Sequence, residues 1–368
     1  MHFKILRLRK IATAAATIGM ALLQGDIAPM SVRAREATAP IESALDAAWK
    51  MYARRYISPE GRVIDDANGN ASHSEGQGYA MLIAVRLNDS EVFARLWSWS
   101  RANLFVRNDP LPAWVWDPDT TPHTRDIDDA SDGNMLMAWA LMEGGRRWGI
   151  ASYLTDARKI ARAVADSDTT PSRYGVVLLP GSHGFRGSDR PDGPVVNLSY
   201  WLFPAFRELK RAVPDFDWDS IAANGLSIIA AARFGNDKLP TDWISLAGTK
   251  AAPANGFPQV FGYDVVRVPL YLAWYRPSDR NALAVFAPLL TPSRMKAPSV
   301  IDIETGRARE RFGGKGYNSI LALLQCALNG SPFPREFYDV EPELYYPTTL
   351  HILALLAAYD SYPACVRH

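Results

Sequence analysis

The sequence predicts an all-α fold whose helices form two concentric layers, with a few short strands in the loops. Two observations carry this prediction. Apolar residues recur at helical spacing through most of the chain. Segments that are apolar nearly all round, such as 79–85 and 352–358, alternate with amphipathic ones such as 153–166. The first kind of helix is enclosed on most sides and the second faces solvent along one side, so the alternation fits an inner and an outer layer.

The first helical stripe runs from Ile41 to Tyr56, with apolar residues facing one side. Further helices are predicted, to within a few residues, at 75–88, 90–105, 130–148, 153–166, 199–212, 217–233, 264–275, 279–290, 316–328 and 348–360. The best strand candidate is 174–180, which precedes a Gly-Ser-His-Gly turn. No internal repeat or low-complexity linker divides the chain, so residues 35–368 are predicted to be one domain.

Composition limits the functions that the chain can have. Its 368 residues are 48% apolar and 21% charged, which is ordinary for a globular protein with a sizeable core. The 40 basic and 39 acidic residues give a net charge of +1, which provides no electrostatic reason to bind nucleic acid or an anionic membrane. The 11 tryptophans are many, and such residues either fill a large core or line a ligand groove.

The N-terminus has the pattern of a secretory signal peptide, assigned to residues 1–34. A basic segment at 1–10 precedes an apolar run at 11–23 and the small-residue sequence Val-Arg-Ala at 32–34. The run is short for a transmembrane helix of about 20 residues, although an uncleaved anchor or an ordinary helix remains the alternative. The sequence therefore predicts a periplasmic or secreted protein without stable membrane insertion after cleavage.

Two cysteines, Cys326 and Cys365, are present. An oxidising compartment would permit a disulfide between them, but sequence alone does not place two cysteines within bonding distance. Both lie in helix-like surroundings, so two buried thiols are an equal alternative.

The first of three acidic segments is Ser-His-Ser-Glu-Gly-Gln-Gly-Tyr at 72–79. Glu75 lies where a loop becomes a helix, and the glycines beside it allow another segment to approach the backbone closely. One interpretation is that the carboxyl group of Glu75 takes part in catalysis. The other is that an acidic residue in a first helical turn interacts favourably with the helix dipole.

The other two acidic segments are 128–134 and 262–269. The first includes Asp132 and precedes an apolar helix, where clustered acids commonly act as caps. The second includes Asp264 and Arg267, which are three residues apart and could form a structural salt bridge on one helix face.

Together these acids and the tryptophans match the requirements of glycoside hydrolysis. That reaction uses one carboxyl group to protonate the leaving oxygen and one carboxylate to activate water or attack carbon. Aromatic side chains at 114 and 116, with Trp97, Trp99 and Trp201, are candidate platforms for sugar rings, although each alone is more typical of a core. The loop histidines lack metal-ligand spacing, so neither a metal nor another cofactor is expected.

These segments resemble glycoside hydrolase family 8, especially endoglucanases encoded with bacterial cellulose synthase. The segment 72–82 looks like the general-acid motif of the family, Ala-Ser-Asp-Gly at 130–133 resembles its central signature, and Tyr-Asp-Val-Val-Arg-Val-Pro at 263–269 resembles the segment with the catalytic base. The motifs occur in family order, and the resemblance spans roughly residues 40–362.

The resemblance implies an (α/α)6 barrel of six inner and six outer helices, with the substrate cleft across the inner-helix ends. It also implies an inverting mechanism. Glu75 carries over as the general acid and Asp264 as the general base, while Asp132 carries over as the acid that contacts the distorted sugar.

The resemblance also implies that Trp114, Tyr263 and Arg267 help to hold the sugar or the base. Arg267 is expected to lie near enough to Asp264 to lower its pKa. One departure concerns the second acid of the central signature, two residues after Asp132, which is Asn134 here. An asparagine keeps hydrogen bonding but removes a charge, which puts the support of Asp132 in doubt.

The sequence therefore predicts an endo-β-1,4-glucanase that hydrolyses internal bonds of a cellulose-like polysaccharide. The resemblance adds a link to cellulose synthesis and a possible cellulose synthase partner. Xylan and chitosan are other substrates within the family. The alternative from another class is a glucan-binding scaffold with little catalysis, against which the presence of both Glu75 and Asp264 argues.

Overall fold

A computed structural model describes the backbone at residues 30–275 and 280–366, and the side chains from residue 40 onward within these ranges. The chain divides into two units, 1–36 and 37–368, and the description below concerns the second. Most of the predicted signal peptide lies outside the described residues, so it stays a prediction. Among the described residues, no helix combines the length and apolar character needed to cross a membrane.

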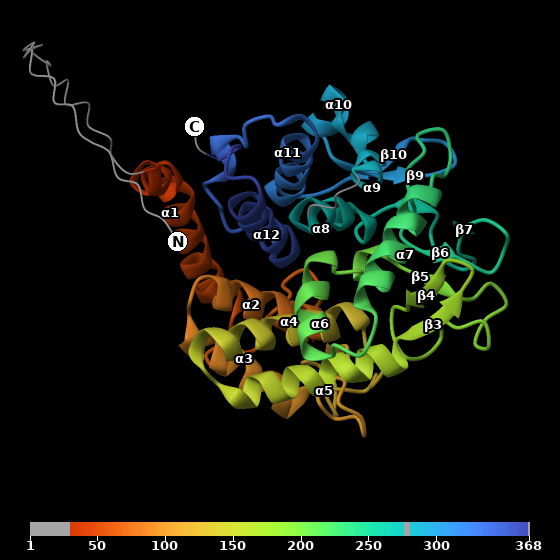
Figure 1. The fold of residues 1–368 in the computed structure, drawn as a ribbon, viewed down its shortest axis with the longest axis horizontal. Coiled ribbons are helices and arrows are strands. Elements are labelled where there is room, and N and C mark those ends of the chain that lie inside the picture. Colours follow the sequence, from red (N-terminus) through yellow and green to blue (C-terminus); the bar gives the residue numbers. More distant parts are fainter. Residues whose placement is uncertain (1–29, 276–279, 367–368) are drawn as a thin grey trace, which may run out of the picture. The chain divides into compact units, whose positions relative to one another are not determined.

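Helices make up most of the regular structure (Figure 1). The α-helices are α1 (Met30–Tyr56), α2 (Ser74–Arg86), α3 (Ser90–Asn103), α4 (Ser131–Trp148), α5 (Ala151–Ser167), α6 (Phe206–Ala212), α7 (Trp218–Ala231), α8 (Val268–Tyr275), α9 (Asn281–Ala284), α10 (Pro292–Lys296), α11 (Lys315–Asn329) and α12 (Tyr345–Ser361). The 3-10 turns are η1 (Leu198–Tyr200), η2 (Phe203–Ala205), η3 (Val265–Arg267), η4 (Ala287–Leu290) and η5 (Arg335–Phe337).

Two predicted helices are broken into shorter pieces. The segment 199–212 contains η1, η2 and only then α6, and Pro204 lies inside η2. The segment 279–290 contains α9 and η4, and Pro288 lies near the start of η4. Proline has no amide hydrogen to donate, so a continuous α-helical hydrogen-bond pattern is interrupted at both places.

Short strands lie in the connections and form small antiparallel sheets. The predicted strand at 174–180 is confirmed as β4 (Gly175–Leu178), which pairs with β3 (Thr169–Ser172). The other strands are β1 (Ser72–His73), β2 (Val115–Trp116), β5 (Val195–Val196), β6 (Ile244–Ser245), β7 (Ala252–Pro253), β8 (Val260–Phe261), β9 (Ser299–Asp302) and β10 (Ala308–Arg311). The strands β3 to β7 gather at one side of the fold, on the right in Figure 1.

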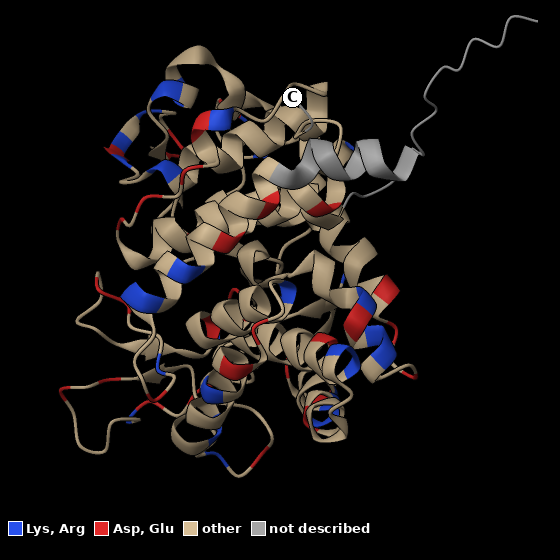
Figure 2. Ribbon diagram, turned by 90° about the vertical axis from the view of Figure 1, so that its left-hand side faces the viewer, with Lys and Arg blue, Asp and Glu red and all other residues tan. Residues whose placement is uncertain are grey.

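Burial separates the helices into the two predicted layers. Nearly every described side chain of α2, α4, α8 and α12 is buried, whereas α3 and α5 bury one face only. The inner helix α2 packs against α4, and α12 packs against α8 and α11. Charged residues of both signs are interspersed along the ribbon, with long uncharged stretches between them (Figure 2).

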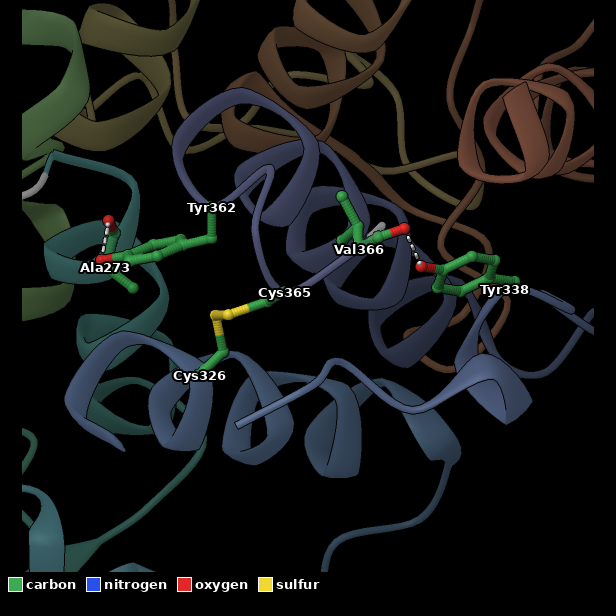
Figure 3. Close-up of a disulfide and its surroundings, with 6 residues drawn as sticks. All are labelled: Ala273, Cys326, Tyr338, Tyr362, Cys365 and Val366. Carbon is green, nitrogen blue, oxygen red and sulfur yellow. Dashed lines mark hydrogen bonds between the residues drawn. A yellow bond between two sulfur atoms is a disulfide. The ribbon is translucent and has the colours of Figure 1, made fainter. Parts of the chain in front are cut away.

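A disulfide joins Cys326 in α11 to Cys365 after α12 (Figure 3). The two Cα atoms are 6.2 Å apart, and the bond closes a loop with a sequence separation of 39 residues. Of the two alternatives for these cysteines, the structure therefore supports the disulfide. Near it, Tyr338 Oη donates a hydrogen bond to the carbonyl of Val366 (3.1 Å), which also holds the C-terminal segment in place.

Candidate active site

The N-terminal ends of four buried helices meet at one point. Glu75 is the second residue of α2, Asp132 is the second residue of α4, and Tyr346 is the second residue of α12. Arg267 ends η3, directly before α8. Gly78 allows the close packing of α2 and α4, because a Cβ atom there would lie 2.5 Å from Cβ of Leu136. The close approach expected at these glycines is confirmed.

The buried guanidinium of Arg267 connects these helix ends. Its Nη1 atom donates to Oε1 of Glu75 and to the hydroxyl of Tyr346 (3.1 Å). Its Nη2 atom donates to Oδ2 of Asp132 (2.9 Å) and to Oγ of Ser199 (3.1 Å). One cation therefore fixes two of the three predicted catalytic carboxyl groups relative to each other.

Asp264, the third predicted catalytic residue, is held by a different partner. Its Oδ2 atom accepts a hydrogen bond from Nδ2 of Asn197 (2.8 Å). Asn197 is itself oriented by Ser199, whose backbone N–H (3.0 Å) and hydroxyl (2.7 Å) both donate to its Oδ1 atom. The salt bridge between Asp264 and Arg267, considered as a structural alternative, does not form; the ion pairs of Arg267 go to Glu75 and Asp132.

Arg267 lowers the pKa of Asp264, as expected, but the net shift of this pKa is upward. Burial raises the pKa of Asp264, and this effect exceeds the opposing attraction of Arg267 and the hydrogen bond from Asn197. The reason is that the guanidinium is shared among several carboxyl groups, while Asp264 lies in a desolvated position.

Asp132 is buried, and burial together with the charge of Glu75 raises its pKa to about 8, despite the attraction of Arg267. Asp132 therefore holds a proton to higher pH than an exposed aspartate does. Burial thus raises the pKa of both Asp132 and Asp264, and perturbed pKa values of this kind cluster at functional sites.

Asp242 is a fourth carboxyl group at the site, and the sequence did not single it out. Burial first, and the charge of Asp264 second, raise its pKa to about 7. It lies just before β6 in the connection 235–262, which the sequence predicts only as a loop. A lone acid in a loop gives no signal of this position, and the same holds for Asn197, Ser199 and Tyr346.

The predicted sugar-binding aromatics lie next to the acids and reach the surface. Trp114 is 40% exposed, and its carbonyl accepts a hydrogen bond from the amide of Ser74 (2.9 Å), beside Glu75. The following strand β2 pairs with β1, which leads directly into α2. Tyr263 precedes Asp264 and is 44% exposed. Trp201, in contrast, is completely buried, so it fills the core instead of lining a groove.

Asn134, the departure from the family signature, does not contact Asp132. Its Nδ2 atom donates to Asp129 (2.8 Å) and to Asp168 (3.0 Å). An acid at this position would place a third carboxyl group beside those two, with strong repulsion. Asn134 therefore stabilises a neighbouring acidic pair, and the hydrogen bonds of Asp132 come from Arg267 and from the amide of Gly133 (2.8 Å).

Comparison with known proteins shows the family. The profile described as glycosyl hydrolases family 8 matches residues 24–360. A probable endoglucanase of Novacetimonas hansenii is 34% identical over 86% of this chain and 92% of its own length, and an endoglucanase of Cellulomonas uda is 33% identical over 87% and 90%. The structure of an endo-β-1,4-glucanase from Acetobacter xylinum superposes with a TM-score of 0.78, at 33% identity, covering 87% of this chain and 99% of that one.

A glycoside hydrolase breaks the glycosidic bond with a pair of carboxyl groups, and this site has carboxyl groups at and near the ends of the inner helices. The chain belongs to glycoside hydrolase family 8. The (α/α)6 barrel implied by the resemblance is likewise confirmed, by the helical layers and by the similar solved structures.

Proposed function

We propose that this protein is an endo-β-1,4-glucanase that cuts cellulose-like chains with inversion of configuration. The names of the similar proteins, endoglucanases and an endo-β-1,4-glucanase, support the substrate class. The observation that carries the mechanism is that Arg267 binds Glu75 and Asp132 at the inner-helix ends, while Asp264, three residues before Arg267, is bound separately by Asn197. Because Glu75 lies on α2 and Asp264 lies in the turn before η3, the two groups come from separate segments and can act on opposite sides of one sugar.

Glu75 is the general acid in this proposal and gives its proton to the oxygen of the leaving chain. Asp264 is the general base and takes a proton from a water molecule that attacks the anomeric carbon from the opposite face. The glycosidic bond breaks as the new C–O bond forms, so a β-linked substrate yields an α-anomeric product. Afterwards the proton from Glu75 is on the leaving hydroxyl group and Asp264 carries the proton taken from water, and proton exchange with solvent restores both carboxyl groups.

Asp132 and Arg267 hold the sugar ring next to the bond that breaks. A protonated Asp132 can donate a hydrogen bond to a sugar hydroxyl, which an ionised carboxylate cannot do. Trp114 and Tyr263 offer exposed aromatic faces to neighbouring sugar rings, whose C–H faces are apolar.

The activity is tested by incubating the purified protein with carboxymethyl-cellulose, xylan and chitosan. We expect reducing ends to appear from carboxymethyl-cellulose first, and viscosity to fall early because internal cuts shorten long chains rapidly. Faster release from xylan or chitosan would replace the substrate assignment. A slow loss of viscosity with abundant reducing ends would indicate cleavage at chain ends and would contradict internal cleavage.

We also propose that the protein is exported and that residues 1–34 are removed. The basic, apolar and small-residue pattern of the N-terminus supports this. N-terminal sequencing of protein from cell fractions should find a start near Arg35 outside the cytoplasm, and an intact Met1 in the cytoplasm would contradict it. A role beside cellulose synthase, suggested by the resemblance, is tested by co-purification with that complex.

A further inference from the structure

The short turn that carries Asp264 has little regular structure of its own. It runs from Gly262, after the two-residue strand β8, to Val265, where the 3-10 turn η3 begins. A general base must be placed accurately, since misplacement by about 1 Å can cost 10²-fold in rate. The side chain that holds this turn is therefore important for the reaction.

Asp242 binds the turn at both ends. Its Oδ1 atom accepts the backbone N–H of Gly262 (2.9 Å) and the backbone N–H of Val265 (3.0 Å). These amides flank Asp264, so the carboxyl group spans the residue that is proposed as the base. The side chain is 9% exposed, which shields both hydrogen bonds from water.

Asp242 is itself held firmly. Its own amide donates to the carbonyl of Val260 (3.0 Å), and the hydroxyl of Thr241 donates to the same carbonyl (2.9 Å). The next residue, Trp243, lies between two parallel rings, with centroids 4.3 Å from Phe257 and 5.7 Å from Phe185. These contacts hold the backbone on both sides of Asp242 in place, and the backbone in turn holds the carboxyl group against the turn.

The fit between this carboxyl group and the turn is close. A Cβ atom on Gly262 would lie 2.3 Å from Oδ2 of Asp242, nearer than van der Waals contact allows. A glycine at this position therefore lets the carboxyl group lie directly under the turn. This contact explains the glycine that begins the segment 262–269.

We propose that Asp242 is a positioning residue for hydrolysis, which fixes the catalytic carboxyl group of Asp264 through two hydrogen bonds to the backbone on either side of it. The inference rests on the proposed role of Asp264 as general base. Asp242 acts through the turn and contacts Asp264's neighbours, so its loss affects turnover more than substrate binding. The groups facing it are Asp264, Arg267 and the two amides.

The test compares Asp242→Ala with Asp242→Asn on carboxymethyl-cellulose. Alanine removes both hydrogen bonds, whereas the amide oxygen of asparagine still accepts them. We expect Asp242→Ala to lower kcat by about 10²-fold, with KM within about threefold, and Asp242→Asn to recover most of kcat. A kcat for Asp242→Ala near that of the native protein would overturn the proposal, as would an asparagine variant as slow as the alanine one.

A matched control separates positioning from general loss of folding. Asp360 is a partly exposed acid, hydrogen-bonded to Trp274 Nε1 (2.9 Å) and paired with Arg86 at the opposite ends of the inner helices. Asp360→Ala should lower the melting temperature without changing kcat of the remaining folded protein. If it lowers kcat as much as Asp242→Ala does, the effect of Asp242 is nonspecific and the proposal fails.

Asp264→Asn distinguishes failure of this proposal from failure of the proposed function. Near-normal activity of Asp264→Asn would remove the base assignment and the positioning role with it. Loss of activity in Asp264→Asn together with a fully active Asp242→Ala would overturn the positioning role alone and leave the base in place.

Discussion

The two ends of the inner helices differ in how their charged side chains are paired. At the N-terminal ends, the guanidinium of Arg267 pairs with Glu75 and Asp132, and its charge also acts on the carboxyl groups of Asp242 and Asp264. At the C-terminal ends, each acid has strong partners of its own. Glu143 accepts from Trp139 Nε1 (2.6 Å), Asp360 accepts from Trp274 Nε1 (2.9 Å), and Arg86 pairs with both acids.

The C-terminal end also has a cavity lined by several cations. A cavity of about 1130 Å³ there is lined by five arginines of α2, α4 and α6, namely Arg86, Arg146, Arg147, Arg207 and Arg211. Glu208 lies between two of them and pairs with both Arg146 (2.5 Å) and Arg211. Arginine side chains interact favourably with the negative ends of helix dipoles, so this end is electrostatically compensated.

The difference teaches that burial alone does not make a catalytic acid. Burial raises the pKa of carboxyl groups at both ends, including Glu143 and Asp360, but these two each accept a hydrogen bond from a tryptophan and share Arg86. At the N-terminal ends, the helix dipoles favour anions. Burial first, and the charge of a neighbouring carboxyl group second, raise the pKa of Asp132 and Asp242. The following predictions test whether chemistry is confined to it.

Substitution of the proposed general acid should have the largest effect. Glu75→Gln should lower kcat by about 10²–10⁴-fold, because no proton reaches the leaving oxygen, while binding of the glucan changes little. The matched control is Glu143→Gln at the other end, which should keep kcat near its native value. Steady-state kinetics and a binding isotherm check both. Equal losses in the two variants would break the comparison between the ends.

The disulfide should affect stability and leave chemistry unchanged. The double variant Cys326→Ala/Cys365→Ala opens a loop with a separation of 39 residues, and we expect the free energy of unfolding to fall by about 4 kcal/mol. Denaturant unfolding measures this. Below the melting temperature kcat and KM should stay near native values, and a changed KM would mean that this region reaches the substrate site.

Asp132 should destabilise the folded protein as pH rises. Its folded pKa of about 8 lies above the unfolded value of about 4, so its proton stabilises the fold at low pH and is lost as pH rises through this window. Asp132→Asn should therefore raise the free energy of unfolding at pH 8 by about 1–2 kcal/mol and flatten its decline between pH 5 and 8. The exposed control Asp46→Asn should show neither change in denaturant titrations. A less stable Asp132→Asn variant at pH 8 would contradict the account.

The smallest effect is expected from the sugar platform. Trp114→Ala should raise KM about tenfold, which corresponds to about 1.4 kcal/mol of binding free energy, with little change in melting temperature. The control Trp201→Ala removes a completely buried ring and should cost about 3–5 kcal/mol of stability. If Trp114→Ala lowers the melting temperature and leaves KM unchanged, Trp114 belongs to the core.

Sequence patterns predicted the helices better than their arrangement. Apolar periodicity placed α2, α3, α4 and α12 within a few residues, because each buries a continuous face or its whole surface. Periodicity does not say which helix ends meet, so the barrel followed only from the resemblance. The two prolines that break predicted helices are visible in the sequence, yet the surrounding apolar pattern hid their effect.

The sequence predicted the site residues that lie in local motifs. It did not predict the residues that reach the site from distant parts of the chain. Glu75, Asp132 and Asp264 lie in recognisable segments, and the structure brings the first two onto Arg267. Asp242 and Asn197 reach Asp264 or its turn from connections about 20 and 67 residues away, and neither has a local pattern that marks it. The raised pKa of Asp264 also depends on burial, which short motifs do not reveal.

The central claim is that Glu75 and Asp264 act as acid and base on opposite sides of one glycosidic bond. Proton NMR during the first turnovers of a soluble β-1,4-gluco-oligosaccharide tests it most directly, because the two anomeric protons of the new reducing end give separate signals. The account predicts that the α-anomer appears first and that the β-anomer grows in only by mutarotation. Initial appearance of the β-anomer would contradict inversion, since it requires a carboxylate that attacks the sugar carbon itself.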